Sequence, residues 1–334
     1  DRENPPEDRV IEVAGYRITW DDDMPNFVSS AESGLRFGHL RRLTVLDDDR
    51  ARLELRSGRE VELEGGATDL GSEMRELLVE DAEEGVVEVE WEELVEIRVA
   101  PAPASARPSG SRLHGTLEDR WGNEYTGYIS WEQDLILTTD TLRTQGGQVE
   151  REIPFGRISA IENGPEGEVV MLRGGGETPL TEANVSEWGS VQIQVSDPGL
   201  GQVEVGWDEI GSIRFHDPET PTTYDGFDGG HRLRGTVVTR TDEEITGWVR
   251  WDGDEEYSWE ILDGEWEGVV FDVELGKVAS IERDVDVVAE VELQRGATVE
   301  VAAENFARVT LTDGRVLRMD GSNDVNDDNK GIFI

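Results

Sequence analysis

Residues 112–131 read RLHGTLEDRWGNEYTGYISW, and residues 232–251 read RLRGTVVTRTDEEITGWVRW. Nine of these 20 positions are identical at a constant offset of 120, so the chain contains an internal repeat. A similar motif occurs near the start of the chain, where residues 15–20 (GYRITW) match the segments that end at Trp131 and Trp251. We therefore expect one strand plan to occur several times.

A second kind of module follows the first in each repeat. Residues 85–94 (GVVEVEWEEL) recur as residues 201–210 (GQVEVGWDEI), and residues 52–59 (RLELRSGR) recur as residues 308–315 (RVTLTDGR). The predicted organisation is repeat 1 (residues 1–99, with an N-terminal segment 1–13 and modules at about 15–46 and 52–99), a Pro/Ala linker (100–111), repeat 2 (112–215, modules at about 112–163 and 168–215), a second linker (216–231) and repeat 3 (232–334, a module at about 232–283 and a truncated module at about 298–334).

The modules have the residue pattern of β-strands. Val87, Val89 and Trp91 alternate with glutamates, which is the period of a half-buried strand. Gly58 and Gly122 lie between alternating runs, where hairpin turns are expected. Roughly five short strands per module, with one helical turn before the last, predict a small barrel.

Two segments resemble known small barrels. Residues 122–134 (GNEYTGYISWEQD) resemble the first motif of Sm-like barrels, and residues 207–215 (WDEIGSIRF) are similar to the ending of SH3-like barrels. The resemblance implies an all-β fold of tandem five-stranded SH3/Sm-like barrels: six modules in three two-module units, with the last module incomplete. Sm-like proteins hold RNA with residues that follow the motif's Asp. Here Asp134 is followed by Leu135-Ile136-Leu137, so RNA binding is not implied.

The charge of the chain excludes several classes of partner. Its 75 Asp and Glu residues outnumber 31 Lys and Arg, which gives a net charge of −44. This field repels nucleic-acid phosphates and anionic membrane surfaces. The chain has no Cys, which excludes disulfides and thiolate chemistry. No apolar stretch is long enough for a membrane span, so we predict no nucleic-acid partner and no membrane insertion.

No catalytic constellation emerges from the residues, and we predict no enzyme activity. Adjacent carboxylates carry little information in so acidic a chain, although a carboxylate-dependent hydrolase stays as the weakest alternative. Tryptophan suggests sugar stacking, but Trp20, Trp131 and Trp251 share one repeat position, and Trp91 and Trp207 share another. A repeated position favours core packing over a binding site.

A calcium site is the metal-binding hypothesis that the pattern favours. Asp324, Asn326 and Asp328 present oxygen atoms at alternate positions, as calcium loops do. The segment departs from an EF-hand, because Asn329 replaces the expected Gly and the bidentate Glu is missing. A polar turn before residues 331–334 is favoured over a specific calcium site, and no cofactor is required in either case.

The third repeat stops short of its counterparts. Residues 66–79 align without a gap to residues 321–334, but the first repeat then continues for 20 residues that carry two more strands. A barrel without them exposes backbone groups and apolar side chains. We expect the N-terminal strand Arg9, Val10, Ile11, Glu12, Val13 of one chain to complete the module that ends in Gly331, Ile332, Phe333, Ile334 of a neighbour. A fragment whose C-terminus was lost and closure within one molecule are the alternatives.

Head-to-tail strand addition generates a filament that does not close. The sequence therefore favours a non-enzymatic structural repeat protein that polymerises with itself. An extracellular peptide- or glycan-binding module is the main alternative. The chain begins with Asp rather than Met, so we expect a processed chain at the cell surface or outside the cell, its signal peptide removed. The strong negative charge predicts that assembly requires salt or calcium.

Overall fold

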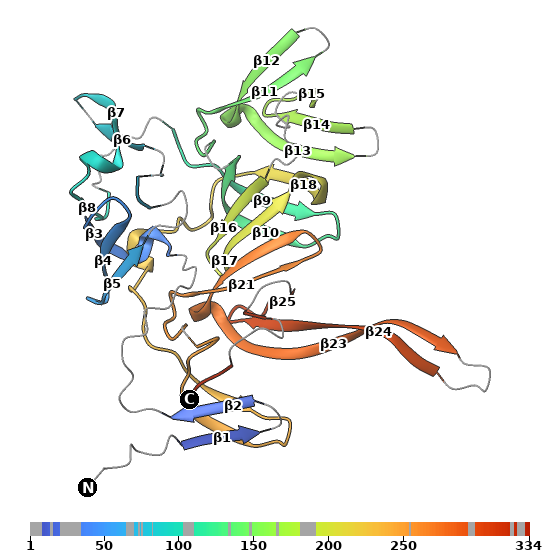
Figure 1. Cartoon of the computed structure of the whole chain (residues 1–334). Helices are drawn as coiled ribbons and strands as arrows, with labels where there is room; N and C mark the ends of the chain where they lie inside the picture. Colours follow the sequence, from blue (N-terminus) through green and yellow to red (C-terminus); the bar gives the residue numbers. More distant parts are fainter. Residues whose placement is uncertain are drawn as a thin grey trace. The chain divides into compact units, whose positions relative to one another are not determined.

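The computed structural model shows an all-β protein (Figure 1). It describes the chain except for residues 1–8, 14–15, 21–34, 65–69, 73, 75, 82, 103–109, 133–134, 147–148, 165–166, 181–191, 254, 293–297, 321–323 and 326–330. The helices among the described residues are single turns, and none is long and apolar enough to cross a membrane. The predicted all-β class is confirmed.

Each repeat contributes short strands and 3-10 turns. Repeat 1 supplies β1 (Arg9–Val13), β2 (Tyr16–Trp20), η1 (Phe37–His39), β3 (Leu40–Val45), β4 (Arg50–Leu55), β5 (Glu60–Glu64), β6 (Leu77–Asp81), β7 (Gly85–Val89), η2 (Trp91–Glu93) and β8 (Glu96–Arg98). Repeat 2 supplies β9 (His114–Asp119), β10 (Glu124–Trp131), β11 (Thr141–Gly146), β12 (Val149–Pro154), η3 (Phe155–Arg157), β13 (Ile158–Gly164), β14 (Gly167–Leu172), β15 (Glu177–Leu180), β16 (Gln192–Asp197), β17 (Gly201–Gly206), η4 (Trp207–Glu209) and β18 (Ile210–Phe215). The rest are η5 (Tyr224–Gly226), β19 (Arg234–Val238), β20 (Glu244–Trp248), β21 (Ile261–Trp266), β22 (Val269–Glu274), η6 (Leu275–Lys277), β23 (Val278–Glu292), β24 (Thr298–Leu311) and β25 (Val316–Met319).

The contacts divide the chain into two compact units. The larger unit comprises Asp1–Gly34, Gly110–Glu219 and Arg232–Ile334, and the smaller comprises Leu35–Ser109 and Thr220–His231. Part of the predicted second linker thus packs within the smaller unit. There the Tyr224 hydroxyl donates to the Leu40 carbonyl at 3.0 Å, and the Gly229 N–H donates to Nδ1 of His39 at 3.2 Å.

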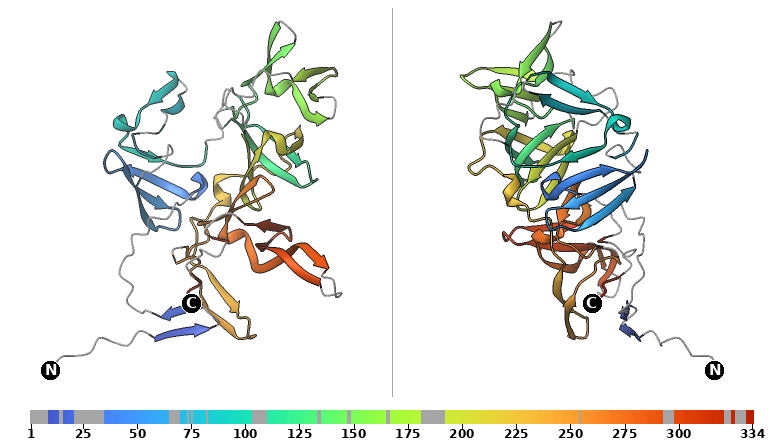
Figure 2. Two further views of the ribbon diagram at one scale, coloured as in Figure 1. Left: turned by 45° about the vertical axis from the view of Figure 1, so that its right-hand side comes forward. Right: turned by 90° about the vertical axis from the view of Figure 1, so that its left-hand side faces the viewer.

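The larger unit is built around a ten-stranded antiparallel sheet with the order β15-β14-β13-β18-β9-β10-β16-β17-β22-β21. This sheet is continuous from repeat 2 into repeat 3, because β17 pairs with β22. Figure 2 shows from two further sides the long ribbon of β23 and β24, which forms a separate three-stranded sheet with β25. The described strands form open sheets, and no closed barrel is found among them.

The last strand of repeat 2 lies between two strands of the preceding module. Strand β18 pairs with β9 through Ile213 and Leu117, and with β13 through Ile213 and Ile161. The smaller unit repeats part of this arrangement in the order β5-β4-β3-β8, with β8 in the place of β18. The two modules of repeat 2 are therefore interlocked.

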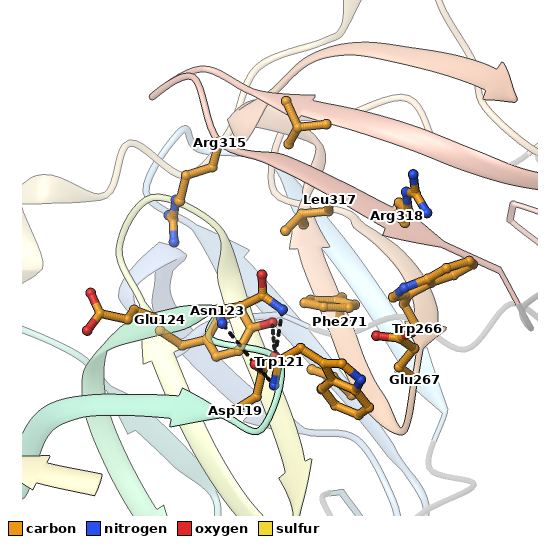
Figure 3. A pocket seen from close by; sticks show the side chains of 13 residues that line it. Asp119, Trp121, Asn123, Glu124, Trp266, Glu267, Phe271, Arg315, Leu317 and Arg318 are labelled. Atoms are coloured by element: carbon orange, nitrogen blue, oxygen red, sulfur yellow. Dashed lines mark hydrogen bonds between the residues drawn. The ribbon is translucent and has the colours of Figure 1, made fainter. Parts of the chain in front are cut away.

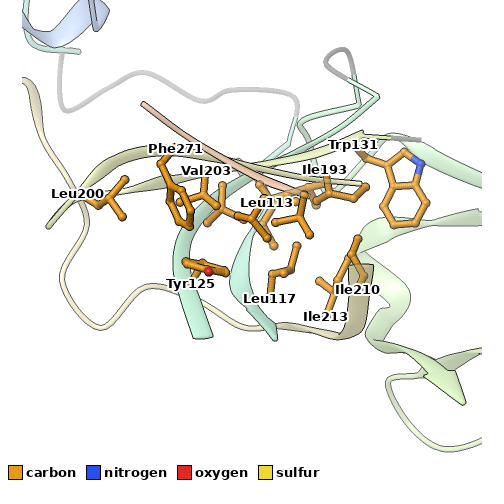
Figure 4. Packing of buried hydrophobic residues seen from close by; sticks show 14 of the residues in the cluster. Leu113, Leu117, Tyr125, Trp131, Ile193, Leu200, Val203, Ile210, Ile213 and Phe271 are labelled. Carbon is orange, nitrogen blue, oxygen red and sulfur yellow. The ribbon is translucent and has the colours of Figure 1, made fainter. Parts of the chain in front are cut away.

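A mixed aliphatic and aromatic core fills the larger unit (Figure 4). Trp131 is 1 % exposed and packs against Phe155 and Trp207, with ring centroids 5.7 and 5.4 Å apart. In the smaller unit Trp91 is buried at the position that Trp207 occupies in repeat 2. The prediction that these repeated tryptophans are core residues is confirmed at Trp91, Trp131 and Trp207.

Candidate functional sites

The first candidate site is a pair of strand edges in repeat 3. Among the described residues β19 pairs only with β20, and β23 pairs only with β24. Their counterparts in repeat 2, β9 and β13, both also pair with β18. The described part of repeat 3 contains no counterpart of β18.

The side chains on these edges are more exposed than their counterparts. Leu117 is fully buried, whereas Val237, at the same repeat position, is half-buried. Thr116 is 9 % exposed, whereas Thr236 is exposed, and Val238 on the same strand is 62 % exposed. Repeat 3 thus presents backbone and apolar surface that β18 covers in repeat 2.

The C-terminal residues occupy the position of the next strand. Phe333 and Arg250 exchange two backbone hydrogen bonds of 2.9 Å. In repeat 2 the corresponding pair is Ser130 and Gln194, which joins β10 to β16. Residues 331–334 therefore begin the counterpart of β16 in the register that repeat 2 uses.

The predicted donor strand, residues 9–13, forms a hairpin in this structure. Strand β1 pairs with β2, with Ile11 opposite Ile18 and Val13 opposite Tyr16. By its position in the sequence this hairpin is the counterpart of β9 and β10, but among the described residues it forms a separate two-stranded sheet. The two predicted interface segments do not pair with each other among the described contacts, and pairing between chains stays a prediction.

The second candidate site is a cluster of carboxylates around Asp324. One carboxylate oxygen from each of Asp252, Glu255 and Asp324 lies within 4.8 Å of the others. Asp252 and Asp324 are 4 % and 6 % exposed. The turn 251–255, closed by hydrogen bonds between Trp251 and Glu255, supplies the first two groups, and the Trp251 indole N–H donates to the Asp324 carbonyl at 3.0 Å.

Burial raises the pKa of Asp324 to about 7, and the nearby charges of Asp263 and Asp252 act in the same direction. The Asp263 backbone N–H donates to Oδ2 of Asp324 at 3.0 Å, which opposes this rise. Buried carboxylates this close are stabilised either by protonation or by a cation. The geometry fits a hard divalent cation with oxygen ligands.

The sequence identified only one member of this cluster. Asp324 is present, while Asn326 and Asp328 lie outside the described residues. Asp252 and Glu255 were missed because they lie some 70 positions earlier in the chain. A comparison of the repeats could have identified Glu255, because it stands where repeat 2 has the apolar residue Leu135.

The third candidate site is a pocket of about 540 Å³ between the β9–β10 turn and repeat 3 (Figure 3). The pocket is lined by aromatic and aliphatic residues together with charged and amide side chains. It is lined by Asp119, Trp121, Asn123, Glu124, Tyr125, Trp266, Glu267, Val269, Phe271, Arg315, Val316, Leu317 and Arg318.

Ion pairs already compensate several charges of the pocket. Arg315 donates to both oxygens of Asp197 at 2.6 and 2.8 Å and to Asp313 at 2.8 Å. These hydrogen bonds, with that to Asp197 the strongest, raise the pKa of Arg315. Glu124 pairs with Arg214 at 2.5 Å.

Of the four histidines, which are dispersed in the sequence, two contact each other and the other two approach one aspartate. His114 and His216 have ring centroids 5.1 Å apart, and burial lowers the pKa of His114. His39 and His231 both approach Asp228, at 3.8 and 3.4 Å. Each pair also has backbone or hydroxyl partners, as when Nε2 of His216 lies 3.0 Å from the Thr116 hydroxyl. These contacts could not be predicted from the sequence, because the residues are far apart in the chain.

We compared the chain with protein-family models, with curated proteins and with solved structures, and none of them matches.

Proposed function

We propose that this protein is a non-enzymatic structural repeat protein that assembles head-to-tail by β-strand addition, at the cell surface or outside the cell. The observation that supports the proposal is the pair of edges in β19 and β23, which flank the position that β18 fills in repeat 2. A strand that entered there would pair with both edges and would cover Val237 and Thr236.

The donor must match the pattern of the strand it replaces. Strand β18 buries Ile213 and Phe215, while Arg214 between them reaches Glu118 and Glu124. The N-terminal sequence Ile11-Glu12-Val13 has the same alternation of apolar, charged and apolar residues. Donation to a neighbour requires residues 9–13 to give up their pairing with β2, and in return they pair with two edges, those of β19 and β23.

The net charge sets the conditions for assembly. Chains with a charge of −44 repel one another at low ionic strength. The screening length falls from about 30 Å at 0.01 M salt to about 3 Å at 1 M. We expect assembly above a threshold of salt, and calcium at the Asp324 cluster to lower that threshold.

The test uses one donor variant and one acceptor variant. Deletion of residues 1–13 removes the donor, and Val238→Lys places a charge on the acceptor edge. Each variant alone should stay monomeric in light scattering at high salt, whereas a 1:1 mixture should give dimers, because one donor and one acceptor remain intact. Deletion of residues 1–8 is the matched control and should still form fibres under negative-stain microscopy.

Two outcomes contradict this function. In the first, the wild-type chain stays monomeric at every salt and calcium concentration. In the second, the variant that lacks residues 1–13 forms the same polymers as the wild type.

A further inference from the structure

Two tryptophans of the pocket lie outside the repeated positions. Trp131 and Trp207 recur in other repeats and are buried in the core. Trp121, in contrast, has Thr241 at its counterpart position, and the counterpart of Trp266 is Gly146. The strand plan is built elsewhere in the chain without these two rings, so the repeat itself requires neither of them. Trp266 packs at the edge of the hydrophobic core, whereas Trp121 is exposed.

Trp121 is held in place while much of it stays exposed. Oδ1 of Asp119 accepts the backbone N–H groups of Trp121 and Asn123 at 2.9 and 2.8 Å, which fixes the β9–β10 turn. The Arg120 guanidinium lies 4.7 Å from the centre of the Trp121 ring and is itself paired with Glu209 at 2.7 Å. Trp121 nevertheless remains 40 % exposed. A fixed, exposed aromatic ring binds with little loss of conformational entropy.

Trp266 is fixed in the same way on the repeat 3 side of the pocket. Its ring packs against Phe306 with centroids 5.3 Å apart, and the Arg318 guanidinium lies 5.6 Å from its centre. Buried Phe271 and Leu317 also line the pocket, which Figure 3 shows together with both tryptophans. The pocket volume of about 540 Å³ is within the range of sites for small organic ligands.

The polar groups of the pocket suit a neutral ligand with many hydroxyls. Asp119 is saturated by Asn123, Tyr125 and backbone donors, and Arg315 is bound by Asp197 and Asp313. A charged ligand would have to break such pairs, whereas hydroxyl groups can use the remaining lone pairs and N–H groups. The acidic field of the chain also disfavours anionic ligands.

From these observations we infer that the pocket binds a neutral oligosaccharide. The apolar C–H face of a sugar ring packs on Trp121 or Trp266, and its hydroxyls hydrogen-bond to Asn123 and the neighbouring charged groups. This site would give an assembled structural protein a means of attachment to a glycan surface. It does not depend on the strand-addition site, because it uses different residues.

The test measures binding of four neutral probes, cellohexaose, xylohexaose, maltohexaose and chitohexaose, to the full chain by isothermal titration calorimetry. At least one probe should bind with a dissociation constant of 1 mM or tighter, roughly −4 kcal/mol. Trp121→Ala should weaken that binding by about tenfold or more. Trp248→Ala is the matched control, because Trp248 is also exposed (51 %) but does not line the pocket.

Trp121 is exposed at a turn, so its replacement should leave the circular dichroism spectrum unchanged. The inference is overturned if none of the four probes binds at about 5 mM, or if Trp121→Ala binds as tightly as the wild type. Equal losses in Trp121→Ala and Trp248→Ala would also overturn it, because the effect would then not be specific to the pocket.

Discussion

The ion pair between Arg315 and Asp197 connects repeat 3 to repeat 2, and its removal provides a quantitative test of the repeat junction. Two parallel hydrogen bonds of 2.6 and 2.8 Å join the guanidinium to the carboxylate. The Asp197 side chain is 6 % exposed and that of Arg315 is 33 % exposed. Arg315→Met retains most of the aliphatic stem but leaves the Asp197 carboxylate buried without its cation.

Breaking a buried ion pair costs about 3–5 kcal/mol, and the partial exposure of Arg315 places this one near the lower end, at about 3 kcal/mol. The assay is urea unfolding, together with hydrogen exchange of the amides in β16 and β24, which report the junction directly. Restoring neutrality with Asp197→Asn in the Arg315→Met background should recover part of the loss, because the uncompensated charge is removed.

Arg143→Met serves as the control. Its partner Glu152 lies 3.5 Å away, and both side chains are about 60 % exposed, so the expected loss is below about 0.5 kcal/mol. A loss of less than about 1 kcal/mol in Arg315→Met would refute the conclusion that this pair stabilises the junction.

Two further predictions follow from the structure. Because the folded-state pKa of Asp324 is about 7, above that of the unfolded chain, the folded state binds more protons between pH 4 and 7, and stability should fall as pH rises through this window. Asp324→Asn should flatten that dependence in thermal melts and abolish any stabilisation by calcium at pH 8, and an unchanged pH profile would contradict it. Gly127→Ala should lower the free energy of unfolding by about 2–3 kcal/mol, since a Cβ there would lie 2.0 Å from the backbone oxygen of Ser196. At the same repeat position Gly247→Ala meets only the side chain of Ile334, at 2.4 Å, and should cost less than about 1 kcal/mol in urea unfolding; equal losses would contradict the prediction.

Much of the strand plan could be predicted from the sequence, but the pairing of strands across modules could not. The alternation around Trp91 and Trp207 identified strands and the turn after them, because the period of two reflects one buried face. The alternation tells which face of a strand is buried, but it does not tell which other strands lie on either side of it. That β18 enters between β9 and β13 depends on contacts far apart in the chain, which period-two patterns do not report.

The candidate sites show the same limit. Asp324 stood out because Asn326 and Asp328 follow it at alternate positions, whereas Asp252 and Glu255 reach it only through the folded chain. Likewise, the residues next to Trp121 in the sequence do not indicate that it lines a pocket. The one indication is that repeat 3 has Thr241 at the same position, and this becomes informative only once the pocket is known.

The position of β18 also has a consequence for the order in which the nascent chain folds. Arg214 of β18 pairs with Glu118 of β9, 96 residues earlier in the chain. During synthesis, therefore, β9 and β13 emerge from the ribosome well before the strand that joins them, and their edges remain open to wrong partners in the meantime. At typical translation rates of about 5–20 residues per second, the edge of β9 stays open for about 5–20 s and that of β13 for about 3–10 s, long enough for a chaperone to engage. Until β18 is synthesised, slowed elongation or loss of a chaperone should therefore favour misfolding of repeat 2.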